Sequence, residues 1–213
     1  MIKLLSIHVG KPREILYQGK STTTGIFKEK VDGPVRVDRL NLEGDRQADL
    51  TVHGGPDKAV YAYPVEHYSY WRTTREDLIF APGIFGENLS IEGLNEDEAC
   101  IGDQYKIGTA VLAITSPRMP CFKLGIKMKD PKFVKDFMQA QRTGFYFKVA
   151  REGAINSGDL IEKIKSDPQR LTVNEVVRLY TTDKENKALL QKAMDTSSLP
   201  QDWRDFFSKR LRH

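Results

Sequence analysis

The segment Val111-Leu-Ala-Ile-Thr-Ser-Pro-Arg-Met-Pro-Cys-Phe-Lys123 runs from an apolar stretch into a loop that contains two prolines. Residues 111–115 predict a buried strand, because their side chains are apolar or β-branched. Proline cannot continue a sheet ladder, so we expect the strand to end there and a stiff loop to begin. That loop carries Cys121, with Arg118 and Lys123 close to it in the sequence.

Short strands are predicted on both sides of this segment. Further apolar or alternating stretches lie at Ile2–Val9, 35–42, 145–149 and 160–164, the second with one slip that suggests a bulge. The dipeptides Gly102-Asp103 and Gly158-Asp159 are interpreted as turns that lead into strands. Many short strands with frequent glycine and proline turn signals favour a β-barrel or a sandwich over a parallel α/β sheet.

Two helices are expected to interrupt this mainly β region. The first is predicted to start at Pro64, because proline is favoured at the first helical position. The second is predicted to have Asp130 as N-cap and Pro131 as its first residue. Apolar side chains at 133, 134, 137 and 138 then form one helical face.

The C-terminal part, residues 170–213, contains no glycine and has helical spacing. Three capping boxes each precede an apolar stripe: Thr172-x-x-Glu175, Thr182-x-x-Glu185 and Ser198-x-x-Gln201. They predict three short helices. The linker Ser166-Asp167-Pro168 suggests a boundary between a barrel domain, residues 1–166, and a three-helix domain, residues 170–213.

Length and charge exclude several classes of protein. The 213 residues suffice for one substantial domain with a small appendage. The 33 basic and 29 acidic residues are interleaved, and a net charge of +4 argues against a dedicated nucleic-acid binder. No apolar run approaches the roughly 18–20 residues of a membrane helix. The first residues are too few and too alternating for a signal peptide, so a cytoplasmic location is expected.

The two cysteines differ in their surroundings. Neither lies in a C-x-x-C motif, although a single disulfide between them stays open. Cations near Cys121 would stabilise a thiolate, the form that attacks electrophiles and binds thiophilic metals. The same residue also fits a buried, inert cysteine. Cys100 has no basic neighbour and is interpreted as structural.

Three further motifs offer polar groups to a ligand. Gly54-Gly55 could present N–H groups to an anion, with His53 and Lys58 beside it, but an ordinary hairpin turn explains the same residues. Asn88 offers donors and acceptors to a pterin-like ring, or simply follows a tight turn that needs two glycines. Arg142 fits either a phosphate contact or an exposed arginine at a helix end.

Taken together, these motifs resemble the MOSC family, whose domains are related to the C-terminal domain of molybdenum-cofactor sulfurases. The matching motifs occur in order as Gly44-Asp-x-Gln-Ala-Asp49, His53-Gly-Gly-x-Asp-Lys-Ala-Val60, Pro82-Gly-x-Phe-Gly-Glu-Asn-Leu89 and Ser116-Pro-Arg-x-Pro-Cys121. The resemblance covers residues 5–165, and the three-helix tail resembles the helical domain appended in the YiiM group.

The resemblance implies a β-barrel-like fold that binds a molybdopterin-type molybdenum cofactor. Cys121 matches the family's cysteine and is the expected thiolate ligand of molybdenum. Arg118 and Lys58 are candidates to contact the pterin phosphate or the metal centre, and Arg142 is a weaker candidate for the phosphate. The remaining matched positions are His53, Gly54, Gly55 and Asn88.

The YiiM group is similar to enzymes that reduce N-hydroxylated compounds, such as hydroxylaminopurine-type base analogues, and so detoxify them. By this resemblance Cys121 holds the metal, and Arg118 or His53 gives a proton to the leaving oxygen. The sequence has no flavin, nicotinamide or iron–sulfur motif, so an NAD(P)H-dependent flavoprotein reductase is expected to supply the electrons. The other expected partner is the small N-hydroxylated substrate, with no stable nucleic acid, no membrane, and a monomer or homodimer as the assembly.

Two alternatives stay open at the level of the sequence. The chain could carry the molybdenum cofactor or transfer sulfur, with Cys121 as a persulfide. It could also be a metal-free interaction protein in which Cys121 is only a core residue. An active Cys121→Ala enzyme would rule out the assignment of Cys121 to the reaction.

Overall fold

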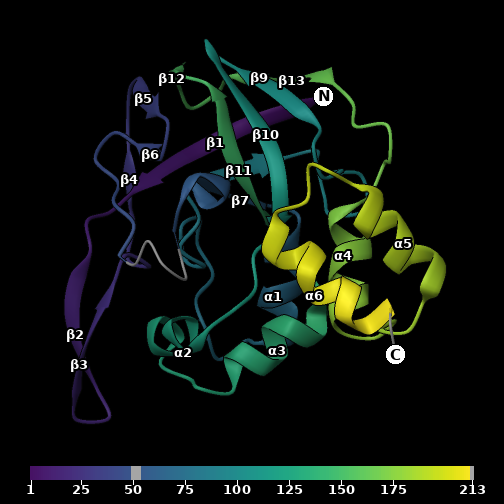
Figure 1. The fold of residues 1–213 in the computed structure, drawn as a ribbon. Helices are drawn as coiled ribbons and strands as arrows, with labels where there is room; N and C mark the ends of the chain where they lie inside the picture. The colour runs from purple at the N-terminus through teal and green to yellow at the C-terminus, as the bar shows by residue number, and fades with distance from the viewer. Residues whose placement is uncertain (49–53, 212–213) are drawn as a thin grey trace.

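A closed seven-stranded β-barrel forms the centre of the molecule (Figure 1). The computed structural model describes residues 1–48 and 54–211. The barrel strands are hydrogen-bonded in the order β13-β9-β10-β11-β7-β8-β1, and β1 closes the ring on β13. Their bounds are β1 Ile2–Val9, β7 Val60–Pro64, β8 Leu89–Glu92, β9 Gln104–Ile107, β10 Ala110–Pro117, β11 Phe145–Arg151 and β13 Leu160–Lys165. All neighbours are antiparallel except β7 and β8. The predicted mainly β, barrel-like fold is confirmed.

Shorter strands surround this barrel. β4 (Glu29–Val31) pairs with β1, and β5 (Val35–Asp38), β6 (Asn41–Leu42) and β12 (Gly153–Ile155) form a separate small sheet. The slip expected near residue 40 is a turn between β5 and β6. β2 (Arg13–Tyr17) and β3 (Lys20–Thr24) form a hairpin that projects from the barrel (Figure 1).

The first part of the Val111–Lys123 segment, up to Pro117, lies in strand β10. All eight residues of β10 are buried. One face of β10 fills the barrel, and helix α4 (Val173–Tyr180) packs against the strand. Because both faces are covered, the strand has the continuous apolar sequence of a fully buried element. The strand ends at Pro117, the first of the two prolines, which is two residues beyond the predicted end at Thr115.

Helices α1 (His67–Thr74), α2 (Phe122–Met128) and α3 (Phe133–Ala140) pack around a second, aromatic core. In it the rings of Trp71 and Phe137 stack with centroids 5.7 Å apart. The predicted helix starts were wrong. Pro64 is the last residue of β7, so α1 begins three residues later. The Asp130 carboxylate accepts the N–H of Lys132 in a turn that precedes α3.

The tail forms the three predicted helices, α4, α5 (Lys187–Asp195) and α6 (Gln201–Leu211). The first capping box is confirmed, since Thr172 and Glu175 bond reciprocally. The other two boxes were wrong. Asn186, not Thr182, caps α5, and the Ser198 hydroxyl donates to the Asp167 carboxylate instead of capping α6. Local spacing therefore located all three helices but only the first of their caps.

The tail and the barrel share one hydrophobic core. Val176 and Phe207 from the tail are fully buried in the same cluster as Leu112 and Phe147 from the barrel. At the joint, the N–H of Asp167 donates to the Asp103 carboxylate at 2.8 Å. The proposed boundary at residues 166–168 stays a prediction, and the joint itself is a fixed, hydrogen-bonded segment. None of the described helices has the length and apolar character needed to cross a bilayer.

Because the core is shared, Phe207→Ala should destabilise the barrel as well as the tail, by about 3–5 kcal/mol. The chain has two tryptophans, so a Trp203→Phe background leaves Trp71 as a fluorescent reporter of the barrel side. Urea unfolding followed by Trp71 should shift to lower denaturant when Phe207 is truncated. A Trp71 transition that does not move would contradict the shared core.

Candidate functional site

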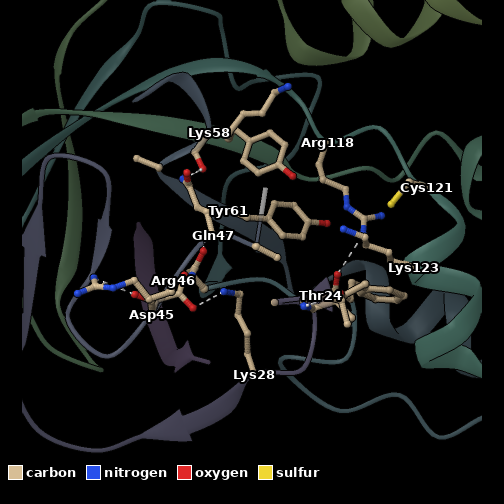
Figure 2. Close-up of a pocket in the computed structure, with 18 of the residues that line it drawn as sticks. Thr24, Lys28, Asp45, Arg46, Gln47, Lys58, Tyr61, Arg118, Cys121 and Lys123 are labelled. Carbon is tan, nitrogen blue, oxygen red and sulfur yellow. Dashed lines mark hydrogen bonds and ion pairs between the residues drawn. The ribbon is translucent and has the colours of Figure 1, made fainter. Parts of the chain in front are cut away.

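A cavity of about 120 Å³ lies against one side of the barrel, where the four sequence motifs meet (Figure 2). Its wall includes Asp45 from the first motif, Lys58 from the second, Asn88 from the third and Cys121 from the proline loop. Thr24 at the end of β3 and Lys28, just before β4, cover another side. The fold thus brings together residues that lie far apart in the chain.

Cys121 reaches the cavity because the strand β10 ends just before it. Cys121 is the N-cap residue of α2, in extended conformation, and its half-buried side chain lines the cavity. Both cysteines are free thiols. Burial raises the pKa of the other thiol, Cys100, which lies outside the cavity among hydrophobic core residues. Cys121 is therefore the thiol available to a ligand.

Arg118 lies beside Cys121 and is only 5% exposed (Figure 2). Its Nη2 donates to the Phe85 carbonyl at 3.4 Å, and its guanidinium lies 5.5 Å from the Tyr61 ring and 5.3 Å from the Phe137 ring. Its Nη1 has no hydrogen-bond partner among the described residues. A buried guanidinium without a carboxylate is costly, so this nitrogen is suited to an anionic ligand.

The cavity is strongly cationic. The described residues that line it include one carboxylate, Asp45, and these cations: Lys28, Arg46, Lys58, Arg118 and Lys123. Asp45 is paired with Lys28, whose Nζ lies 2.5 Å from Oδ1. Burial lowers the pKa of Lys28, and Asp45 partly opposes that shift. Among the described lining residues, the charges of Arg118 and Lys123 favour an anion.

Asn88 lines the cavity, but its side chain already has partners. Its Oδ1 accepts the N–H of Tyr61 at 3.0 Å, and its Nδ2 donates to the His8 carbonyl and to Asp45 Oδ2 at 3.2 and 3.0 Å. The amide therefore joins β7, β1 and the Asp45 segment. Its predicted contact with the pterin stays a prediction, and the structure gives Asn88 a positioning role.

Gly54 and Gly55 themselves are not part of the described cavity wall. The N–H of Gly55 donates to Gln47 Oε1 at 2.8 Å, so that donor is occupied. Gln47 Nε2 also donates to the Lys58 carbonyl at 2.9 Å, which fixes the loop that brings Lys58 to the cavity. His53 falls outside the described residues. Sequence reasoning missed Gln47 as the residue that holds this loop, although it lies inside the first motif.

Arg142 is also absent from the described wall of the cavity. Its Nη1 lies 2.9 Å from His67 Nδ1, and its guanidinium lies over the Tyr70 ring at 4.5 Å. The predicted phosphate contact of Arg142 stays a prediction. The residues that line the cavity and that the sequence did not suggest include Lys28, Tyr61 and Tyr146. They come from elements whose placement only the folded chain shows.

Lys127 holds the segment that covers the cavity. Its Nζ donates to the carbonyls of Ile26 and Gly83 at 2.9 and 2.6 Å. Burial is the main cause that lowers the pKa of Lys127 to about 8, and the nearby cations Lys28 and Arg118 contribute to this shift. The buried carboxylate of Glu87 opposes these effects.

The donor set suits a metal that arrives inside an organic cofactor. Among the described residues, no group of three or more His, Cys, Asp or Glu side chains could hold a metal ion. A metal bound by the protein alone needs three or four ligands. A single thiolate beside a cationic cavity instead fits a thiophilic metal whose other ligands come from an anionic cofactor. Cys121 and the unpaired Nη1 of Arg118 therefore fit a molybdenum cofactor.

Comparison with known families agrees with these features. The MOSC domain matches residues 49–162, and the YiiM-like, 3-alpha helix domain matches residues 171–213. Protein YiiM of Escherichia coli is 32% identical over 190 residues, which cover 88% of this chain and 84% of that protein. YflK of Bacillus subtilis, described as uncharacterized, is 38% identical over 97% of this chain and 93% of its own length.

A fungal relative and a solved structure add to the comparison. A Gibberella moniliformis protein named "Reductase" is 34% identical over 179 residues, which cover 83% of this chain but 32% of that protein. The crystal structure of YiiM from Geobacillus stearothermophilus superposes with a TM-score of 0.84 and 35% identity, over 99% of this chain and 100% of that one.

Lys127→Met should change how stability depends on pH. Lys127 loses its proton near pH 8 in the folded state and near 10.5 in the unfolded state, so the unfolded state binds more protons between these values. The free energy of unfolding should therefore rise with pH across this window, by up to about 3 kcal/mol from this group. Urea unfolding across the window should lose this contribution in Lys127→Met and keep it in Lys135→Met, an exposed control. Equal pH slopes in wild type and Lys127→Met would contradict the assignment.

Proposed function

Because this chain belongs to the MOSC family and carries the three-helix domain of its YiiM-like members, we propose that it is a molybdenum-cofactor-dependent reductase of N-hydroxylated compounds. Hydroxylaminopurine-type base analogues are the proposed substrates, and their reduction would detoxify them. The observation that carries this proposal is the pairing of an accessible thiol, Cys121, with the buried and incompletely paired guanidinium of Arg118 in one cationic cavity.

The cofactor's anionic groups account for the charge of the cavity. Phosphate oxygens are strong acceptors for arginine and lysine, and the planar guanidinium can donate two N–H groups to one anion. Arg118 has a buried donor available for this contact, and Lys123 adds charge at the wall. Asp45 does not cancel this charge, since Lys28 already pairs with it.

Cys121 is proposed to hold the metal, and the bound cofactor supplies the two-electron redox chemistry. The overall reaction is R–NH–OH with two electrons and two protons going to R–NH₂ and water, so the N–O bond breaks. Arginine keeps its proton in proteins. Arg118 therefore stabilises negative charge on the leaving oxygen and does not donate the proton, a role that stays with His53 among the predicted residues.

The electrons are proposed to come from a separate NAD(P)H-dependent flavoprotein. The sequence contains no nucleotide or iron–sulfur motif that would hold a second redox group. The name of the fungal relative supports the oxidoreductase class. That protein is about three times as long as the matched part, and its activity is its own.

Protein purified anaerobically from a host that makes the cofactor should contain molybdenum and pterin in near-stoichiometric amounts. Cys121→Ala should lose or loosen the metal, because the variant removes the thiolate ligand. Cys100→Ala is the matched control, since it removes the buried thiol outside the cavity. Metal analysis and pterin fluorescence measure both components. Absence of both from wild type, or equal metal in wild type and Cys121→Ala, would overturn the proposal.

Turnover separates the reductase from a cofactor carrier or a sulfur-transfer protein. With an added low-potential reductant, the loaded wild type should convert an N-hydroxylated purine to the amine. Cys121→Ala should abolish this conversion, and Cys100→Ala should retain it. Chromatographic quantification of the amine measures the rate. A protein that holds the cofactor but forms no amine would favour the carrier.

A further inference from the structure

A buried carboxylate lies outside the cavity, behind the residues that hold Arg118. Glu96 is 4% exposed, and both of its oxygens have partners. Oε1 accepts the N–H of Gly144 at 2.7 Å, and Oε2 lies 2.6 Å from His67 Nε2. Neither Glu96 nor His67 belongs to the cavity wall described above. The function proposed so far therefore leaves this cluster unexplained.

Arg142 fixes the direction of both hydrogen bonds that His67 makes. A guanidinium can only donate, so His67 Nδ1 must accept from Arg142 Nη1 at 2.9 Å. His67 must then carry its proton on Nε2 and donate it to Glu96. Hydrogen bonds thus run from Arg142 through His67 to Glu96, which also accepts from Gly144.

Gly144 connects this chain of hydrogen bonds to the site. Its carbonyl accepts the backbone N–H of Arg118 at 3.3 Å, and the neighbouring Thr143 carbonyl accepts the Tyr61 hydroxyl at 2.8 Å. The Tyr61 ring in turn faces the Arg118 guanidinium. Gly144 has φ +63°, and a Cβ there would lie 2.4 Å from the Ala62 carbonyl oxygen. The turn is therefore packed directly against β7, and Glu96 is the side chain that accepts the N–H of Gly144.

The three-helix tail holds the same segment from outside. The N–H of Asn174, in α4, donates to the Glu96 carbonyl at 2.9 Å. Gln141 Nε2, just before the 143–144 turn, donates to the Thr181 hydroxyl at 3.0 Å. Both the carboxylate and the turn that it holds are thus tied to one helix of the tail.

We infer that Glu96 is a positioning residue of the site, which fixes Arg118 through Gly144, and that helix α4 acts on the site through Glu96. This inference deepens the proposed function and relies on it only for the identity of the anion that Arg118 meets. It gives the tail a role in the site besides packing.

Glu96→Gln tests the inference with little change in size. In wild type the carboxylate accepts from two donors, the N–H groups of Gly144 and His67. Glutamine has one acceptor oxygen, so in either amide orientation one of the two donors faces an N–H group. The variant must lose a buried hydrogen bond, and the turn that holds Arg118 should shift or loosen.

A second substitution, at Arg142, should restore the hydrogen bonds between positions 96, 67 and 142, with donors and acceptors exchanged. In Glu96→Gln/Arg142→Gln, nothing forces a proton onto His67 Nε2. The amide introduced at position 96 can then donate to Nε2 while its oxygen accepts from Gly144, and the side-chain oxygen at position 142 can accept from His67 Nδ1. Arg142→Gln alone should keep the wild-type alkylation ratio of the cofactor-free protein, because its amide can still donate to His67 Nδ1.

Alkylation of Cys121 in the cofactor-free protein reports where Arg118 lies. The rate with iodoacetate, an anion, is divided by the rate with iodoacetamide, which is neutral. Both rates scale with the thiolate fraction, so the ratio cancels the pKa of the thiol and reports the local positive charge. Peptide mass spectrometry separates Cys121 from Cys100. Circular dichroism confirms that each variant is folded.

The ratio should fall by roughly threefold in Arg118→Met, and by a smaller but measurable factor in Glu96→Gln. It should return to the wild-type value in the double variant. A wild-type ratio in Glu96→Gln, or a double variant no better than the single, would overturn the inference. So would an unchanged ratio in Arg118→Met, because Arg118 would then not face the thiol.

If Glu96→Gln does not fold, the comparison moves to the double variant and Arg142→Gln. A folded double variant with the wild-type ratio supports the exchange of donors and acceptors, and one that fails to fold overturns it. The assay contains no cofactor, so protein that lacks molybdenum still gives a valid result. Failure of the proposed function and failure of this inference are therefore distinguishable.

Discussion

The side-chain amide of Asn88 is the interaction on which the rest of the site depends. It bonds at once to the backbone of β7, the backbone of β1 and the carboxylate of Asp45. A buried amide that lost these partners would leave several unsatisfied groups, so the three segments are held in one arrangement. Asp45 then receives Lys28 and the N–H of Gly10. The wall of the cavity is thus an extension of a satisfied polar network that begins inside the barrel.

The two buried cations of the cavity, Lys28 and Arg118, have different environments. The charge of Lys28 is balanced by the carboxylate of Asp45. Burial lowers the pKa of Lys28, which means that burial disfavours its charged form. Arg118 meets aromatic faces and one carbonyl, and a guanidinium cannot relieve its cost by losing a proton. An anion that enters the cavity gains most by meeting Arg118. The unequal pairing therefore directs a ligand toward the side of the cavity that carries Cys121.

The sequence predicted much of the fold, because its strongest signals are local. Buried strands such as β10 and the apolar stripes of the tail depend on side-chain periodicity, and they were found. Helix starts were missed where tertiary contacts override a local preference. Pro64 completes the parallel pair of β7 with β8, and Ser198 bonds to Asp167. The role of Asn88, and the fact that Arg142 does not line the described cavity, depend on segments far apart in the chain. No local pattern encodes either one.

The tail illustrates why a motif-based division of this chain is incomplete. Its helices have their own capping and their own apolar stripes, as an independent unit would. Yet Phe207 lies in the barrel core, and α4 bonds to the segment around Glu96 and to Gln141. A cavity with a single protein thiol has few covalent means to fix a ligand, so its selectivity rests on the position of charged groups. Arg118 is held by a turn with little freedom, and helices outside the barrel hold that turn. The helices that a sequence scan separates from the barrel therefore belong to the support of its site.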